Sequence, residues 1–194
     1  MVYVDHVQLP YFLIMRYRYL FMKIDGVVTT KESRNRVIYD SDGCSNFPIG
    51  FDKDCINRIN RFVRSHARDS IPIRVICTSQ WRYLKDFSSK IKKEGLLVHK
   101  SFEPTNGINP VPLCAQISQW LVKNMDTVEN WAIIENNILD SRQFYRNDRL
   151  VMVEDGINDL HIKKIKKIFG VGTIKKRISV KPKKPTFEAL YGLA

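Results

Sequence analysis

Four short polar segments stand directly after hydrophobic runs in this 194-residue sequence. They are Asp25-Gly26, Thr78-Ser79, Glu135-Asn136 and Glu154-Asp155. A pair of hydroxyl groups combined with several carboxylates is typical of a site that transfers phosphoryl groups with the help of Mg²⁺. The four segments can form such a site only if the fold brings them together.

The hydrophobic pattern around these segments predicts strands that alternate with helices. Strands are expected at residues 16–24, 73–77, 96–98, 131–134 and 150–153, helices at 51–65, 81–93, 113–123 and 157–169, and long loops at 29–50 and 101–112. Such alternation implies an α/β fold, in which a parallel sheet has helices on both faces and binds its ligands beyond the carboxyl ends of the strands. All four polar segments would then lie at one edge of the sheet.

The charge of the chain is strongly positive and unevenly distributed. There are 32 Lys and Arg against 20 Asp and Glu, a net charge of +12 at pH 7. Residues 160–194 hold ten of the basic residues and a single acid, Glu188. A cationic end of this kind attracts polyanions such as nucleic acid, an acidic protein surface or anionic lipid, unless it serves only as a solubilising tail. The candidate nucleic-acid ligands are Lys163, Lys164, Lys166, Lys167, Lys175, Lys176, Arg177, Lys181, Lys183 and Lys184.

Hydropathy and cysteine spacing argue against several other classes of protein. No run of about 18 uncharged apolar residues is present, so we expect no membrane span. Cys44, Cys55, Cys77 and Cys114 are scattered without a Cys-x-x-Cys pair, and the histidines do not join them at the spacing of a zinc site. Four free thiols favour an intracellular location, in the cytoplasm or within a nucleoprotein particle.

Four stretches of the sequence resemble, in the right order, the motifs of haloacid dehalogenase-like (HAD) phosphatases. They are FMKIDGVV (21–28), VICTSQWR (75–82), WAIIENN (131–137) and RLVMVEDGIND (149–159). The Ser-x-Trp-Arg part of the second stretch is similar to the branch of this superfamily found in RNA-repair multidomain proteins. The resemblance implies a three-layer Rossmannoid fold over residues 16–170 without a large cap domain. Residues 1–15 would then be an N-terminal extension, and residues 171–194 a basic tail.

The resemblance also reveals departures at the positions that carry the family's chemistry. HAD phosphatases attack phosphate with a carboxylate, and Lys23 stands at that position. Asp25 at the acid/base position and Thr78 at the phosphate-binding hydroxyl position are retained, whereas Glu135 and Asn136 replace the paired metal-binding aspartates. The family's third motif supplies a cation near the start of the helix expected at 113–123, and none is found there.

These departures predict a degenerate site that performs no catalysis and holds no cofactor. An ammonium group cannot bind Mg²⁺, and losing the nucleophile costs more rate than positioning and electrostatics can restore. Lys23 is instead expected to form an ion pair with Asp25 or Glu135, or to neutralise a bound phosphate. The residues of the degenerate site are Lys23, Asp25, Thr78, Ser79, Glu135 and Asn136.

A second register would restore an active site. The stretch VIYDSDG (37–43) contains Asp40 and Asp42 in an Asp-x-Asp-Gly pattern, and with Thr78 these would form a catalytic set. Asp155 and Asp159 would then hold Mg²⁺. Only three apolar residues precede Asp40, a poor central strand for a buried parallel sheet, so the degenerate register is preferred. Asp155 or Asn158 would in that case simply cap the helix at 157–169, as Asp52 is expected to cap the helix at 51–65.

Three functions follow from these alternatives. The preferred one is a catalytically inactive binding or assembly module that contacts nucleic acid, RNA in preference to DNA, or a nucleoprotein complex through its basic end. An acidic protein surface is the other expected partner. The second is an active Mg²⁺-dependent phosphatase acting on nucleotide or nucleic-acid phosphates. The third is a structural component of a virion or ribonucleoprotein particle.

Overall fold

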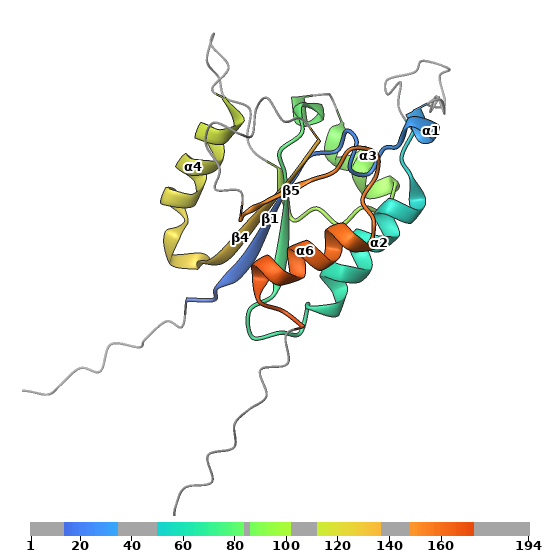
Figure 1. Cartoon of the computed structure of the whole chain (residues 1–194). Helices are drawn as coiled ribbons and strands as arrows, with labels where there is room; N and C mark the ends of the chain where they lie inside the picture. Colours follow the sequence, from blue (N-terminus) through green and yellow to red (C-terminus); the bar gives the residue numbers. More distant parts are fainter. Residues whose placement is uncertain (1–13, 35–49, 84–85, 102–111, 137–147, 173–194) are drawn as a thin grey trace, which may run out of the picture.

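The centre of the molecule is a parallel sheet of five strands in the order β3-β2-β1-β4-β5. The computed structural model describes residues 14–34, 50–83, 86–101, 112–136 and 148–172. Strand β1 lies in the middle, paired with β2 on one side and with β4 on the other (Figure 1). The strands are β1 (Tyr17–Met22), β2 (Ile73–Cys77), β3 (Lys100–Ser101), β4 (Val128–Glu135) and β5 (Leu150–Met152). The α/β fold with a parallel sheet is thereby confirmed.

Helices cover both faces of this sheet, which gives three layers. Helices α2 and α6 lie side by side on one face, and α4 lies on the other (Figure 1). No large cap domain is seen among the described residues. The helices are α1 (Lys31–Arg34), α2 (Lys53–Ser65), α3 (Phe87–Lys93), α4 (Leu113–Lys123) and α6 (Asp159–Phe169), with short 3₁₀ turns at η1 (Gln80–Tyr83) and η2 (Met125–Thr127).

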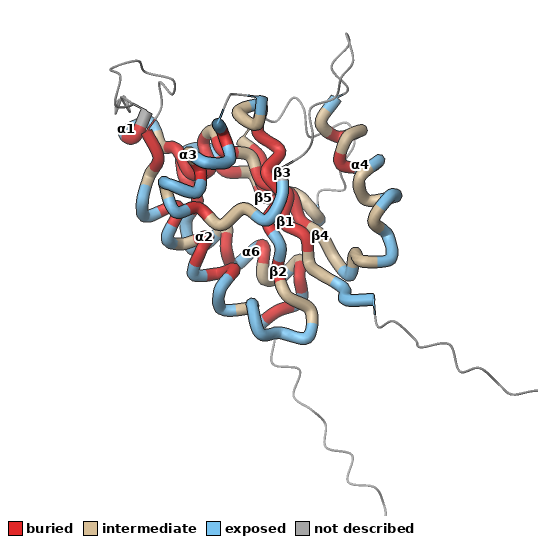
Figure 2. The backbone as a smooth tube through the Cα atoms, turned by 180° about the vertical axis from the view of Figure 1, so that it is seen from behind, coloured by how far each residue is buried: buried red, intermediate tan, exposed pale blue. Residues whose placement is uncertain are grey.

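The alternation of side chains along β1 builds two hydrophobic cores. Leu20 and Met22 pack into the larger core, on the side of α2 and α6, whereas Tyr19 and Phe21 pack into the smaller core under α4. Both faces of the strand are therefore buried, as expected for a central parallel strand. Figure 2 shows the buried residues concentrated along the strands and on the inner sides of the helices.

Side-chain caps set the first residues of the two long helices on the larger core. The Asp52 carboxylate accepts hydrogen bonds from the backbone N–H groups of Asp54 and Cys55 at the start of α2. At the start of α6, Asn158 accepts from the N–H groups of two residues, and His161 accepts in return from the Asn158 N–H. Both caps satisfy N–H groups that have no partner inside the helix. The predicted cap at Asp52 is confirmed, and of the two candidates for α6 the cap is Asn158.

Three predicted segments were wrong in more than their end residues. The helix expected at 81–93 is divided, because η1 ends at Tyr83 and α3 begins after Asp86, which has a positive φ of 60°. The strand expected at 96–98 is also displaced, since β3 is Lys100–Ser101. In the long loop expected at 29–50, residues 31–34 form the short helix α1.

The displacement of the edge strand has a clear cause in α2. The buried side chain of Asn60 donates to the carbonyl of Gly95 at 2.7 Å and accepts from the N–H of Leu97 at 2.9 Å. These backbone groups are therefore satisfied by a side chain instead of a neighbouring strand. Pairing with β2 begins at His99, whose N–H donates to the carbonyl of Val75 at 2.9 Å.

Several expectations fall on residues outside the described ranges. They concern the N-terminal extension up to residue 13, Asp40 and Asp42, most of the loop at 101–112, and the basic tail from residue 173. Within the described residues, no helix is long and apolar enough to cross a membrane.

Candidate functional site

The carboxyl ends of the three inner strands bring the degenerate-site residues together. The N–H of Lys23, directly after β1, donates to the carbonyl of Ile134 in β4 at 3.2 Å. The N–H of Thr78, directly after β2, donates to the carbonyl of Met22 at 2.9 Å. Lys23, Thr78 and Glu135 therefore occupy neighbouring positions along one edge of the sheet, as the parallel topology predicts.

A buried ion pair joins two of these residues across β1 and β4. The Lys23 Nζ atom lies 3.0 Å from Glu135 Oε1, and the side chains are 18% and 3% exposed. The same carboxylate oxygen accepts the N–H of Asn136 at 2.8 Å. Because a carboxylate withdrawn from water needs a partner, Lys23 supplies charge that a metal ion could otherwise have supplied. Of the two pairings expected for Lys23, the structure contains the one with Glu135.

Asp25 lies in a tight turn that follows β1 and contacts the hydroxyl segment after β2. The Ser79 hydroxyl donates to Asp25 Oδ2 at 3.3 Å. Within the turn, Gly26 has a φ of 69°, and a Cβ atom there would lie 2.7 Å from the side-chain nitrogen (Nδ2) of Asn136. Glycine is required because both the backbone conformation and the close approach exclude a side chain. The turn thus places Gly26 directly against the side chain of Asn136.

Two buried polar atoms at this edge have no hydrogen-bond partner among the described residues. They are the hydroxyl oxygen of Thr78 and the side-chain oxygen of Asn136. Thr78 is 3% exposed. Such orphaned groups are uncommon in proteins and are usually satisfied by water or a ligand. The hydroxyl position inferred from the sequence is therefore available to accept or donate a hydrogen bond.

Comparison with known proteins agrees with this arrangement. A family model described as the HAD domain in Swiss Army Knife RNA repair proteins matches residues 19–162. The chain belongs to this family. A search of curated proteins found no match, and a search of solved structures found none. The match extends from β1 into α6, so this HAD domain includes every described residue of the degenerate site.

Arg82 supplies a cation that the sequence motifs did not lead us to expect at this place. Its guanidinium donates from Nη1 to the carbonyls of Thr78 at 2.6 Å and Ser79 at 3.0 Å, and from Nη2 to the side chain of Gln116 at 2.9 Å. Gln116 lies in the first half of α4, where the sequence lacks the third-motif cation of HAD phosphatases. A positive charge therefore does reach the start of α4, but it comes from η1. The Ser-x-Trp-Arg stretch was the only available signal.

The carboxylates assigned to Mg²⁺ in the alternative register have separate partners. Asp155 Oδ1 accepts the N–H of Lys31 at 2.7 Å and so fastens the loop after β5 to the start of α1. Asp159 pairs with Arg58 of α2 at 3.0 Å, and its side chain is 87% exposed. Among the described residues, no group of three His, Cys, Asp or Glu side chains is arranged to hold a metal ion. Asp40 and Asp42, the other carboxylates of that register, lie outside the described residues.

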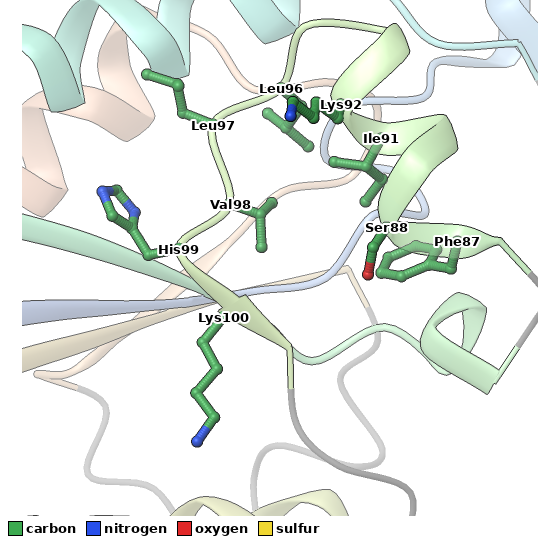
Figure 3. Close-up of a pocket in the computed structure, with 9 residues that line it drawn as sticks. All are labelled: Phe87, Ser88, Ile91, Lys92, Leu96, Leu97, Val98, His99 and Lys100. Carbon is green, nitrogen blue, oxygen red and sulfur yellow. The ribbon is translucent and has the colours of Figure 1, made fainter.

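A hollow beside α3 is lined mainly by apolar and basic side chains and by one imidazole. It has a volume of about 450 Å³, and its lining combines apolar residues of α3 with the segment that leads into β3 (Figure 3). His99 is its one imidazole, and the Nδ1 atom accepts the N–H of Val75 at 3.0 Å. Burial, together with the charge of Arg74, lowers the pKa of His99 and favours the neutral ring that this bond requires. The ring therefore has a structural role at the sheet edge.

Two buried thiols of this HAD domain, those of Cys55 and Cys77, are not activated nucleophiles. Burial raises the pKa of Cys55 to about 11 and that of Cys77 to about 12. A thiol must ionise to attack a substrate, so both remain unreactive near neutral pH.

Proposed function

We propose that this HAD domain is a catalytically inactive member of its family that serves as a binding or assembly module for nucleic acid, RNA in preference to DNA. Its division into an extension (1–15), a folded domain (16–170) and a basic arm (171–194) is part of the proposal. The single observation that carries the inactive assignment is the ion pair between Lys23 and Glu135.

The ion pair opposes catalysis in two ways. At the nucleophile position Lys23 presents an ammonium group, which cannot form an acyl phosphate as a carboxylate can. Its charge also neutralises Glu135, the carboxylate that remains from the metal-binding pair, and repels a divalent cation at a distance of a few ångströms. The position of β1 between β2 and β4 supports the degenerate register, because Lys23 directly follows the central strand.

A phosphatase assay tests the inactive assignment. The full chain is incubated with an aryl phosphate and Mg²⁺, beside its Asp25→Asn and Asp40→Asn variants. We expect no turnover above that of the Asp25→Asn control. Mg²⁺-dependent turnover that disappears in Asp40→Asn would instead establish the second register and an active phosphatase.

The nucleic-acid assignment depends on charge and on family membership. Four of the candidate ligands, Lys163, Lys164, Lys166 and Lys167, lie on α6. The other six follow in the basic arm, outside the described residues. This concentration of cations beside an otherwise nearly balanced chain supports attraction to a polyanion, and the description of the family supports RNA. Scattered cysteines support an intracellular location.

The dependence of RNA affinity on salt concentration distinguishes contacts with phosphate groups from other kinds of contact. Binding of labelled single-stranded RNA to the full chain is measured by fluorescence anisotropy over a range of salt concentrations, with duplex DNA of equal charge as competitor. We expect the logarithm of the affinity to fall linearly with the logarithm of salt, and less steeply when the six arm cations are changed to Gln. Undetectable binding, or binding insensitive to both salt and the arm variant, would overturn the assignment.

A further inference from the structure

A basic hollow lies between the start of β5 and the second half of α6. Its volume is about 480 Å³. We call it the β5–α6 hollow, and it is lined by Asp148, Arg149, Leu150, Lys164, Lys167 and Ile168. Three cations and one carboxylate therefore surround it. It is distinct from the degenerate site, because Leu150 begins β5 whereas Met152, at the other end of the strand, pairs with Glu135.

Two residues of β4 hold the guanidinium of Arg149 in one orientation. Nη1 donates to the side-chain oxygen of Asn130 and, at 3.4 Å, to the carbonyl of Trp131. The guanidinium carbon lies 5.6 Å from the centre of the Trp131 ring. Asn130 in turn donates to the carbonyl of Ile168 at 2.8 Å, which ties this support to α6. A guanidinium that is already oriented loses little entropy when it binds a phosphate.

The two lysines of the hollow carry charges available to a ligand. Lys164 and Lys167 are three residues apart, so they lie on the same side of α6, and both are exposed. Neither has a carboxylate within ion-pair distance among the described residues. The Asp148 carboxylate lies 4.0 Å from Nε of Arg149, and its side chain is 60% exposed. The hollow thus retains a surplus of positive charge.

We propose that the β5–α6 hollow binds the sugar–phosphate backbone of single-stranded RNA, an inference that rests on the proposed function. Arg149 is the oriented donor for one phosphate, and the lysines neutralise its neighbours. A concave surface suits a single strand better than the convex face of a duplex. Helix α6 ends at Phe169, so the basic arm begins at the helix end nearest Lys167 and Ile168.

The test compares two double variants of the full chain that lose equal charge. Lys164→Gln/Lys167→Gln removes the lysines of the hollow, and Lys92→Gln/Lys93→Gln removes two exposed lysines of α3. Binding of a labelled single-stranded RNA of about 12 nucleotides is measured at several salt concentrations. For the hollow variant we expect roughly tenfold weaker binding and a salt slope smaller by about 1.4, from about 0.7 for each lost phosphate contact. The α3 variant is expected to bind nearly as wild type.

The outcomes separate this inference from the proposed function. If wild type binds RNA and the two double variants bind equally, the hollow is not the site, although the proposed function stands. If wild type binds no RNA, both fail. If the hollow variant loses affinity for anionic vesicles or duplex DNA as strongly as for single-stranded RNA, the assignment of the ligand is overturned. Arg149→Lys, which keeps the charge but loses the planar donor, should weaken RNA binding several-fold.

Discussion

Lys23 shows how a single residue changes what a phosphatase-like edge can do. Its ammonium lies against a carboxylate that is almost wholly buried, at 3.0 Å. Burying a charge is costly, and the cost is offset only while the partner remains in place. The pair therefore stabilises the edge in its present form and at the same time removes a carboxylate from metal binding. Under the proposed inactive function, the same two side chains account for both the absence of catalysis and the local stability of the edge.

Removing one member of the pair should destabilise the fold. Lys23→Met leaves Glu135 buried without its cation, so we expect the free energy of unfolding in urea to fall by about 3 kcal/mol. Lys53→Met is the matched control, because Lys53 pairs with Glu94 at 2.6 Å but is 62% exposed, and it should cost less than about 1 kcal/mol. Adding Glu135→Gln to Lys23→Met should recover part of the loss. Equal effects of the two single variants would contradict the argument.

Reversing the charge at position 23 should create a response to Mg²⁺. Lys23→Asp places a carboxylate near Asp25 and Glu135, and like charges confined together repel one another until a cation joins them. We expect Mg²⁺ to raise the melting temperature of this variant and to leave wild type unchanged. Thermal unfolding with and without Mg²⁺ measures the difference. A similar rise for wild type would show that the native site already binds the metal.

At the scale of elements, Asn60 connects α2 to the segment that leads into β3. Its amide satisfies one carbonyl and one N–H of that segment, which then needs no strand partner. Strand β3 is consequently short and lies at the edge of the sheet, an arrangement that limits pairing with other chains.

Replacing this amide should loosen the edge. Asn60→Ala leaves two backbone groups without partners, and we expect a loss of about 2 kcal/mol in the free energy of unfolding. Asn57→Ala, at an exposed position of the same helix, should change it by less than about 0.5 kcal/mol. Hydrogen exchange at Leu97 should quicken only in the first variant. Unchanged exchange there would mean that other groups hold the segment.

The same elements show how far the sequence could predict the structure. Strand β2 and helix α4 have the predicted bounds, because β-branched runs and helical spacing are local signals. Lys23 and Glu135 could be expected to meet, since parallel strands end at one edge. The contact of Asn60 with residues 95–97, and that of Arg82 with Gln116, depend on tertiary packing. Arg82 was also placed in a continuous helix, which the left-handed Asp86 interrupts.

Over the whole molecule, two histidines make stability depend on pH in the same direction. Burial, with the charge of Arg74, lowers the pKa of His99, and burial, with the charge of Lys164, lowers that of His161. Each ring accepts a backbone N–H through Nδ1, which requires the neutral form. Below their ordinary pKa of about 6.5 the unfolded chain binds more protons than the folded one, so stability is present above that pH and lost as the pH falls.

Thermal unfolding between about pH 7.5 and about pH 5.5 tests this dependence, a window in which carboxylates of ordinary pKa stay ionised. We expect the melting temperature of wild type to fall towards the acid end. His99→Asn, which offers an amide oxygen in place of Nδ1, and His161→Gln should together flatten the curve. A double variant as pH-sensitive as wild type would assign the effect to other groups.

The loop after β5 returns to the turn after β1, although more than a hundred residues separate them. The Gly156 N–H donates to the carbonyl of Gly26 at 2.7 Å, and the Ile157 N–H donates to that of Val27 at 2.9 Å. During synthesis the turn that holds Asp25 must therefore wait for residue 157 to leave the ribosome before its last bonds can form. A nascent chain that stopped after Glu135 but before Gly156 would contain Lys23 and Glu135. It would lack the two hydrogen bonds that close the turn beside them.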